Sequence, residues 1–172
     1  EPNIRVEPGG RFFRKDPVLG YTHIPGTFRV ILDDNYEFRV THLQNYLRIT
    51  HPLGTYHGSP AKPEIWILGC SFVHGWLMND EQTFPWLLQE KMPEHEIVNF
   101  GTGGYGTLQS LLQFKQAIGN RRPEVAVIVY GSFHDARNTF LRYRRKYVAS
   151  LNKLGPLRQP YARLDRQGRL RY

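Results

Sequence analysis

Short hydrophobic runs alternate with segments of helical periodicity in the second half of the chain. The first run, Ile65-Trp66-Ile67-Leu68, lies between Pro63 and Gly69, which is typical of a strand buried on both faces. Similar runs at residues 96–100 and 124–130 predict two further strands. The intervening segments, 83–91 and 107–118, carry apolar residues at helical spacing and are predicted to be helices.

This alternation predicts βαβ units, in which the strands are parallel and the helices cover both faces of the sheet. We therefore expect an α/β fold with three α/β/α layers around a parallel sheet. A third helix is expected over about residues 136–151, after the third strand. The last residues, 161–172, predict a hairpin that turns at Asp165-Arg166-Gln167-Gly168.

The first 63 residues follow a different pattern and are rich in Pro and Gly. Two alternating stretches, 27–32 and 36–40, flank Asp33-Asp34-Asn35 and predict a β-hairpin. Residues 46–50 are a candidate for a third strand. We therefore divide the chain into a small β-rich N-terminal extension, residues 1–63, and a main α/β domain, residues 64–172.

Charge is distributed unevenly along the chain, whose net charge is +8 at pH 7. From Arg137 to Tyr172 there are eleven Lys and Arg residues against one acidic residue, Asp165. A solvated helix face and hairpin explain this excess, and an anionic surface partner is the functional alternative. Nucleic acid is not expected, because no recognised binding motif accompanies the charge. No apolar run reaches about 18 residues, and so we expect no membrane span.

Three loops follow the predicted strands, and a parallel sheet places them at the edge where α/β proteins bind ligands. The first loop offers the Ser71 hydroxyl, the second offers Gly104 in a glycine-rich turn, and the third offers His134 and Asp135. Acyl transfer needs a nucleophile and hydrogen-bond donors aimed at the developing oxyanion. The candidate donors are the amides of Ser71 and Gly104 and the side chain of His134.

These loops resemble the sequence blocks of the SGNH (GDSL-like) hydrolases, a family of esterases and lipases on a flavodoxin-like fold. Residues 69–75, Gly-Cys-Ser-Phe-Val-His-Gly, are similar to the first block, Gly-Asp-Ser-x-[Ser/Thr]-x-Gly. Residues 98–104 resemble the second block, and residues 131–135, Gly-Ser-Phe-His-Asp, resemble the third, Gly-x-Asn-Asp. The resemblance covers about residues 64–150. It implies that Ser71 is the nucleophile and Gly104 an oxyanion donor, with Asn99 and Asp135 in supporting positions.

The sequence departs from these blocks at several positions. Cys70 stands where the family has Asp, and strand geometry predicts that it is buried in packing rather than a thiol nucleophile. His134 stands where the family has Asn, and an imidazole N–H can donate a hydrogen bond as the amide does. The alternative for His134 is a structural role, and the alternative for Asp135 is that it only caps the following helix.

The general base that Ser71 requires is the largest gap in this interpretation. The family supplies it from a C-terminal Asp-x-x-His block, whereas no histidine follows His134 in this sequence. We expect the sequence to be a piece of a longer protein. One alternative is that the protein has lost catalysis, and the other is that His134 or His74 acts as a surrogate base. If it is not a base, His74 is expected at the surface rim.

Four histidines of the N-terminal extension lack the spacing of a recognisable metal site. Surface or packing roles are expected for them, and no metal or other cofactor is predicted. They are His23, His42, His51 and His57. Cys70 is the single cysteine, which excludes an internal disulfide.

The expected function is that of a serine hydrolase acting on an ester-linked acyl group of a small molecule or glycan. An esterase, a carbohydrate O-acetyl esterase and an acyltransferase all fit this description. The alternative is a non-catalytic module of the same fold that binds an anionic glycan or another acidic partner. Phosphate binding at the loop 101–106 is a third hypothesis, although the Lys-Ser/Thr ending of a P-loop is absent. An extracytoplasmic location is favoured over a cytoplasmic one.

Overall fold

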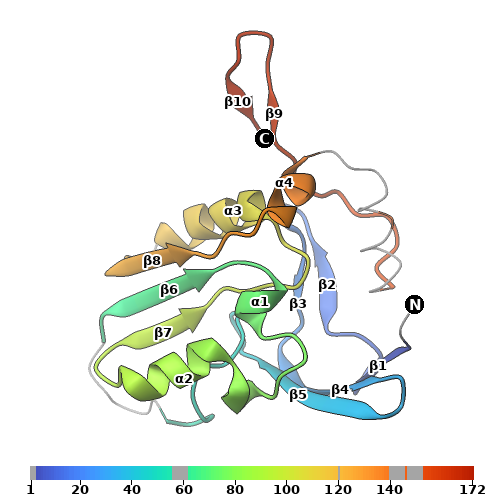
Figure 1. The fold of residues 1–172 in the computed structure, drawn as a ribbon, viewed down its shortest axis with the longest axis vertical. Helices are drawn as coiled ribbons and strands as arrows, with labels where there is room; N and C mark the ends of the chain where they lie inside the picture. Colours follow the sequence, from blue (N-terminus) through green and yellow to red (C-terminus); the bar gives the residue numbers. More distant parts are fainter. Residues whose placement is uncertain (1–2, 56–61, 120, 140–145, 147–152) are drawn as a thin grey trace.

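A computed structural model of the chain describes residues 3–55, 62–119, 121–139, 146 and 153–172 (Figure 1). It has a mixed α/β architecture, in which a small parallel sheet lies beside antiparallel strands of the N-terminal segment. The predicted α/β class is confirmed at this level.

The parallel sheet contains the three strands that the hydrophobic runs predict. Strand β6 (Glu64–Leu68) lies between β7 (Glu96–Asn99) and β8 (Val125–Ile128), and both neighbours pair with it in parallel. Alternate residues of β6 enter two different clusters. Ile65 and Ile67 pack in one, and Trp66 and Leu68 pack in the other. The central strand is therefore buried on both faces, as predicted.

Helices α2 (Phe84–Lys91) and α3 (Thr107–Ile118) form where the helical periodicity predicts them. Leu88 of α2 packs against the cluster of Ile65 and Ile67, and Phe114 of α3 packs against the cluster of Trp66 and Leu68. The two helices thus cover opposite faces of β6. No helix within the described ranges has the length and hydrophobicity needed to cross a bilayer.

The described residues of the C-terminal part include a short helix and a hairpin. Helix α4 (Phe133–Asn138) begins three residues before the predicted start, and most of the predicted helix 136–151 lies outside the described residues. Strands β9 (Arg163–Leu164) and β10 (Leu170–Arg171) pair antiparallel, which confirms the predicted hairpin. This hairpin projects from the body of the molecule (Figure 1).

The N-terminal segment forms two antiparallel units. Strands β1 (Ile4–Glu7), β4 (Gly26–Leu32) and β5 (Tyr36–His42) pair in that order, while β2 (Phe13–Asp16) pairs with β3 (Gly20–His23). The predicted hairpin is therefore β4–β5, and its turn contains Asp33 and Asp34 with φ values of 48° and 59°.

The predicted strand at residues 46–50 is wrong. Tyr46 has a φ of 71° and donates its amide to the Leu43 carbonyl, which makes a tight turn just before this segment. Only Arg48 then makes β-bridges, with His42 of β5 and Asn99 of β7. A single residue therefore joins the antiparallel and parallel strands.

Residues on both sides of position 63 share the largest hydrophobic cluster. Val30 and Val40 of the N-terminal sheet lie in the same cluster as Tyr105 and Leu154 of the main segment. The Tyr21 hydroxyl also donates a hydrogen bond to the Gly103 carbonyl, at 2.8 Å. The N-terminal segment therefore packs on the main segment, as expected, while the division at residue 63 stays a prediction.

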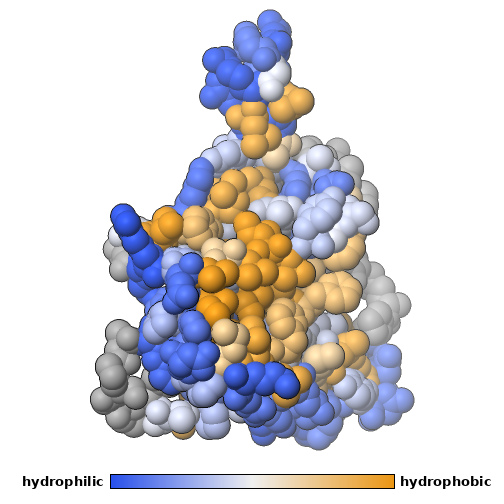
Figure 2. All heavy atoms as spheres, turned by 60° about the vertical axis from the view of Figure 1, so that its left-hand side comes forward, coloured by the Kyte–Doolittle hydropathy of each residue, from blue (hydrophilic) through white to orange (hydrophobic). Residues whose placement is uncertain are grey.

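Strand β8 is much more exposed than a buried parallel strand. Its residues Val125, Val127 and Ile128 are 45%, 42% and 46% exposed. In the described part of the chain β8 pairs only with β6, so its outer edge has no partner strand. Figure 2 shows hydrophobic side chains gathered on one face of the molecule below the C-terminal hairpin. Among the described residues, the expected cover of helices on both faces thus reaches β6 but not β8.

Candidate functional site

The carboxyl ends of β6, β7 and β8 lie at one edge of the parallel sheet, because all three strands run in the same direction. The predicted site residues follow these ends: Ser71 after β6, Gly104 after β7, and His134 after β8. This is the edge at which open α/β sheets bind ligands.

Ser71 is the first residue of the short helix α1 (Ser71–His74). Its carbonyl accepts hydrogen bonds from the amides of Gly75 and Trp76, at 2.9 and 3.0 Å. The side chain is partly exposed, and its hydroxyl makes no hydrogen bond with the described residues. Amides in the first turn of a helix have no intrahelical partner. Ser71 therefore offers a free hydroxyl, and its amide lies in that first turn.

Cys70 precedes the helix in an extended conformation and is 1% exposed. The prediction that it is buried in packing is therefore confirmed. A thiol enclosed in this way lacks the access that a reactive cysteine needs.

Asn99 connects the loop after β7 to helix α1. It is 1% exposed, its side-chain amide donates to the Val73 carbonyl at 3.0 Å, and its side-chain oxygen accepts from the Gly101 amide at 2.8 Å. Thr102 adds a backbone hydrogen bond to the Gly69 carbonyl, at 3.1 Å. The first two loops of the site are therefore held together by buried hydrogen bonds.

Gly104 has a φ of 83°, a left-handed conformation that favours glycine. It lies between the hydrogen bond of Thr102 to the first loop and the start of α3 at Thr107. A glycine in this conformation leaves the backbone open to a ligand without a side chain in the way.

His134 is buried, at 1% exposed, and neither ring nitrogen has a hydrogen-bond partner among the described residues. Its ring packs at right angles to the rings of Tyr130 and Phe133, with centroids 5.8 and 4.9 Å away. Burial and the nearby Arg137 charge lower the pKa of His134, which Asp135 partly opposes. A neutral imidazole with an uncommitted N–H is therefore present in the third loop.

Phe133 brings the third loop to the first. Its ring stacks on that of Phe72, with centroids 5.8 Å apart and an interplanar angle of 27°. Arg137 of α4 donates to the Tyr105 carbonyl at 3.0 Å, which brings the third loop to the second. All three loops therefore meet, although no hydrogen bond within the described ranges joins Ser71, Gly104 and His134 to one another.

Asp135 lies in the first turn of α4 and is exposed. Its carboxylate accepts a hydrogen bond from the Tyr130 hydroxyl at 2.9 Å, and this bond raises the pKa of Tyr130. The carboxylate does not contact a ring nitrogen of His134, since both lack partners in the described part. The two residues therefore do not form an acid–histidine pair.

The expectation that His74 lies at the surface rim is wrong. His74 is 1% exposed, and its Nε2 atom lies 3.0 Å from Nε2 of His42. As the last residue of α1, it packs against the ends of β3 and β5, and this arrangement withdraws it from solvent. His74 is thus buried and hydrogen-bonded to His42, which makes it a poor candidate for a surrogate base.

The other histidines are placed differently from one another. His23 and His42 are buried beside His74, whereas His51 is partly exposed with its Nε2 atom 3.4 Å from a Glu96 carboxylate oxygen. His57 lies outside the described residues. The grouping of His23, His42 and His74 was not predicted, because these residues are far apart in sequence and only the fold brings them together.

Arg48 is a second feature that the sequence did not indicate. Its side chain is fully buried and donates to the carbonyls of His74 and Gly75, both at 2.6 Å, and of Met78, at 2.7 Å. It also lies 3.3 Å from the carboxylate of Asp80, which is 4% exposed. Arg48 therefore fixes the segment that follows Ser71.

The sequence matches no protein-family model and no curated protein. The structure is similar to the crystal structure of AlinE4, an SGNH-hydrolase family esterase, with a TM-score of 0.41 and 19% identity over 55% of this chain and 53% of that chain. Two alanine variants of the same esterase, one at a serine and one at an aspartate, also match with a TM-score of 0.41 and 18% identity, over 55% and 56% of this chain and 53% and 58% of theirs. This chain thus spans little more than half of those proteins and has a distant structural similarity to an SGNH-hydrolase family esterase.

Proposed function

We propose that this chain carries the nucleophile and oxyanion hole of an SGNH-type ester hydrolase on a flavodoxin-like, three-layer α/β/α fold. The observation that supports this best is the position of Ser71, whose uncommitted hydroxyl follows the central strand where three loops meet. The substrate class we propose is an ester-linked acyl group on a small molecule or glycan, such as an O-acetyl group.

In the proposed reaction the Ser71 oxygen attacks the ester carbonyl while a base takes its proton. The negative charge that develops on the carbonyl oxygen is stabilised by the amides of Ser71 and Gly104 and by the ring N–H of His134. Collapse of the intermediate expels the alcohol, which receives the proton, and leaves an acyl group on Ser71. Water then hydrolyses this acyl-enzyme, or an acceptor alcohol takes the acyl group in a transferase.

The base is the part of this mechanism that the described residues do not supply. Asp135 does not orient His134, and His74 is engaged with His42. The resemblance implies an Asp-x-x-His block, and no histidine follows His134 in the sequence. The proposed nucleophile is therefore tested by probe labelling of the full-length protein.

We expect a fluorophosphonate probe to label the full-length protein and Ser71→Ala to lose at least about 10³-fold in labelling rate, because the attacking oxygen is removed. Ser132→Ala is the matched control, since Ser132 is an exposed serine in the loop after β8. Labelling is followed by in-gel fluorescence and by mass spectrometry of the modified peptide. Equal labelling of wild type and Ser71→Ala would contradict the assignment of the nucleophile.

His134 provides a separate test of the oxyanion hole. We expect His134→Leu to lower kcat for a nitrophenyl acetate by about 10²–10³-fold, because one donor to the oxyanion is lost. His134→Asn keeps an N–H donor and should stay within about tenfold of wild type. A structural role would instead make both variants unstable to a similar degree in thermal unfolding, with no difference in kcat between them.

A non-catalytic module that binds an anionic glycan is the second candidate function. It is favoured by the eleven Lys and Arg residues between Arg137 and Tyr172. Binding of an acidic polysaccharide that weakens steeply with salt, without probe labelling of the full-length protein, would support this function in place of the hydrolase.

A further inference from the structure

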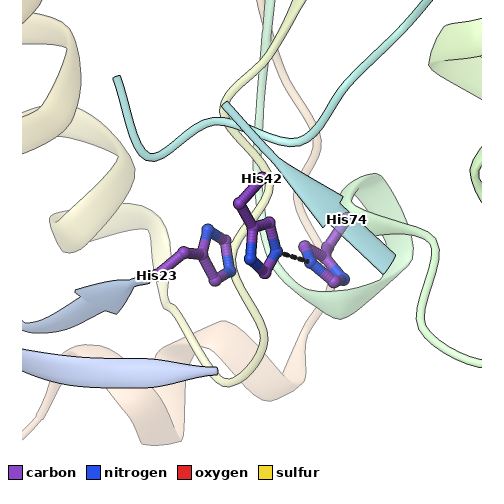
Figure 3. Close-up of side chains that lie close together, drawn as sticks. All are labelled: His23, His42 and His74. Atoms are coloured by element: carbon purple, nitrogen blue, oxygen red, sulfur yellow. Dashed lines mark hydrogen bonds between the residues drawn. The ribbon is translucent and has the colours of Figure 1, made fainter. Parts of the chain in front are cut away.

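Three buried histidines from separate elements lie close together, and one of them, His74, belongs to helix α1. His23 ends β3, His42 ends β5 and His74 ends α1, and they are 1%, 2% and 1% exposed. One ring nitrogen from each residue lies within 4.8 Å of the others. Figure 3 shows the three rings side by side, with the hydrogen bond between His42 and His74. None of the three histidines is a donor in the proposed oxyanion hole.

Backbone carbonyls fix the tautomers of two of these rings. Nδ1 of His23 lies 2.9 Å from the Tyr46 carbonyl, and Nδ1 of His42 lies 3.2 Å from the Ile24 carbonyl. Since a carbonyl oxygen only accepts, each Nδ1 carries the proton and each Nε2 keeps its lone pair. Donation of the second ring N–H to a carbonyl is the usual arrangement of histidines that bind metals.

Two ring nitrogens in the group lack the partner that buried polar atoms normally have. Nε2 of His23 and Nδ1 of His74 have none within the described ranges. Burial lowers the pKa of His23 to about 4 and those of His42 and His74 well below their usual range. A neutral imidazole with an available lone pair is the form of histidine that binds a metal ion.

An aromatic ring and one compensated charge lie near the group. The ring of Phe12 lies 5.6 Å from that of His42 and 6.3 Å from that of His74. The charge of Arg48 disfavours a second cation nearby, but the Asp80 carboxylate, 3.3 Å from Arg48, offsets it. An ion at the histidines would therefore be shielded from bulk solvent without facing an unpaired positive charge.

We propose that His23, His42 and His74 form a binding site for a transition-metal ion of the zinc type, which joins the N-terminal strands to helix α1. Imidazole nitrogens are ligands for Zn²⁺, and a tetrahedral ion with Zn–N distances of about 2.0–2.1 Å holds its ligand atoms roughly 3.3 Å apart. Nε2 of His42 and Nε2 of His74 are already 3.0 Å apart, and for both to bind the ion the His74 proton must lie on Nδ1 rather than on Nε2. The group contains no fourth His, Cys, Asp or Glu among the described residues, which leaves one position for water.

The rings of His23 and His42 must move for this ion to bind. They are stacked, with centroids 3.9 Å apart and an interplanar angle of 11°, so the planes that contain their lone pairs are nearly parallel. For both lone pairs to reach one ion, the His23 ring must turn about its side-chain bonds. The site is therefore close to, but not fully in, the geometry of the loaded state.

The test is zinc retention by the full-length protein after chelator treatment, loading with ZnCl₂ and gel filtration. We expect one Zn²⁺ per chain in the wild-type protein. In His23→Gln, His42→Gln and His74→Gln we expect an affinity for zinc more than roughly 100-fold weaker. The loss of a ligand should exceed the roughly 10- to 100-fold loss of affinity that follows the loss of an outer-shell partner. His95→Gln is the control, since His95 pairs with Glu94 and Glu124 near the surface, and should bind as wild type does.

Failure to retain zinc, or retention unchanged in all three variants, would overturn the proposal. Far-UV circular dichroism checks that each variant is folded. Should a variant not fold, X-ray absorption at the zinc edge of the wild-type protein decides the matter. Three imidazole ligands support the site, and a signal with fewer contradicts it. Ser71→Ala should bind zinc normally, so this result is independent of the proposed hydrolase.

Discussion

Arg48→Met should lower the free energy of unfolding by about 3–5 kcal/mol, the cost typical of breaking a buried ion pair from one side. The variant leaves Asp80 without its buried partner and leaves the carbonyls of His74, Gly75 and Met78 without their donor. Met has a similar reach but no hydrogen atoms to donate. Since small proteins are stable by only about 5–15 kcal/mol, much of the total would be lost.

Urea denaturation followed by circular dichroism measures this change. Arg39→Met is the matched control, because Arg39 also contacts Asp80, at 3.4 Å, but has a side chain that is 55% exposed. Exposed ion pairs contribute little, and so a loss below about 1 kcal/mol is expected for the control. Equal losses of unfolding free energy in the two variants would mean that the buried Arg48 stabilises the protein no more than the exposed Arg39 does.

Gly101→Ala should be the most damaging small substitution in the loop after β7. A Cβ atom at this position would lie 2.2 Å from the His74 amide nitrogen and 2.6 Å from the Val73 carbonyl carbon. Both are backbone atoms, so no rotation of a side chain can relieve the contact. The loop and helix α1 must separate, which would also break the hydrogen bonds of Asn99. We expect a loss of about 3 kcal/mol or more in the free energy of unfolding.

Gly103→Ala, two residues further along, separates this steric effect from the general effect of replacing a glycine. The nearest atom to a Cβ there is Cζ of Phe13 at 3.6 Å, an ordinary van der Waals distance. We expect a change within about 1 kcal/mol, measured by thermal unfolding of both variants in parallel. A tolerated Gly101→Ala would show that α1 and the loop after β7 are not held in close contact.

The local sequence pattern predicted those elements whose hydrophobic periodicity is visible within their own residues. The apolar run at Ile65–Leu68 gave a strand buried on both faces, and the segments 83–91 and 107–118 became helices α2 and α3. The order of strand and loop also predicted that Ser71 follows the carboxyl end of the first strand, and in the structure it follows β6. These features depend on neighbours within about ten residues, which a sequence displays directly.

The features that were missed depend on contacts between distant segments. Arg48 looked like a polar position in a strand, yet a turn at Tyr46 and the nearby carbonyls of α1 give it a buried role. His23, His42 and His74 have no common spacing, and only the meeting of β3, β5 and α1 brings their rings together. The exposure of β8 likewise depends on which elements flank the strand, and not on its own composition.

The open edge of β8 has a practical consequence for anyone handling these residues in isolation. A parallel strand whose outer edge pairs with no strand in the described part of the chain, and whose Val125, Val127 and Ile128 are each more than 40% exposed, is a template on which a second molecule can dock. The apparent molar mass of the 172-residue polypeptide, measured by static light scattering, should therefore rise with concentration. A charged residue in place of Val127 would be the first change to make when a monodisperse sample is wanted.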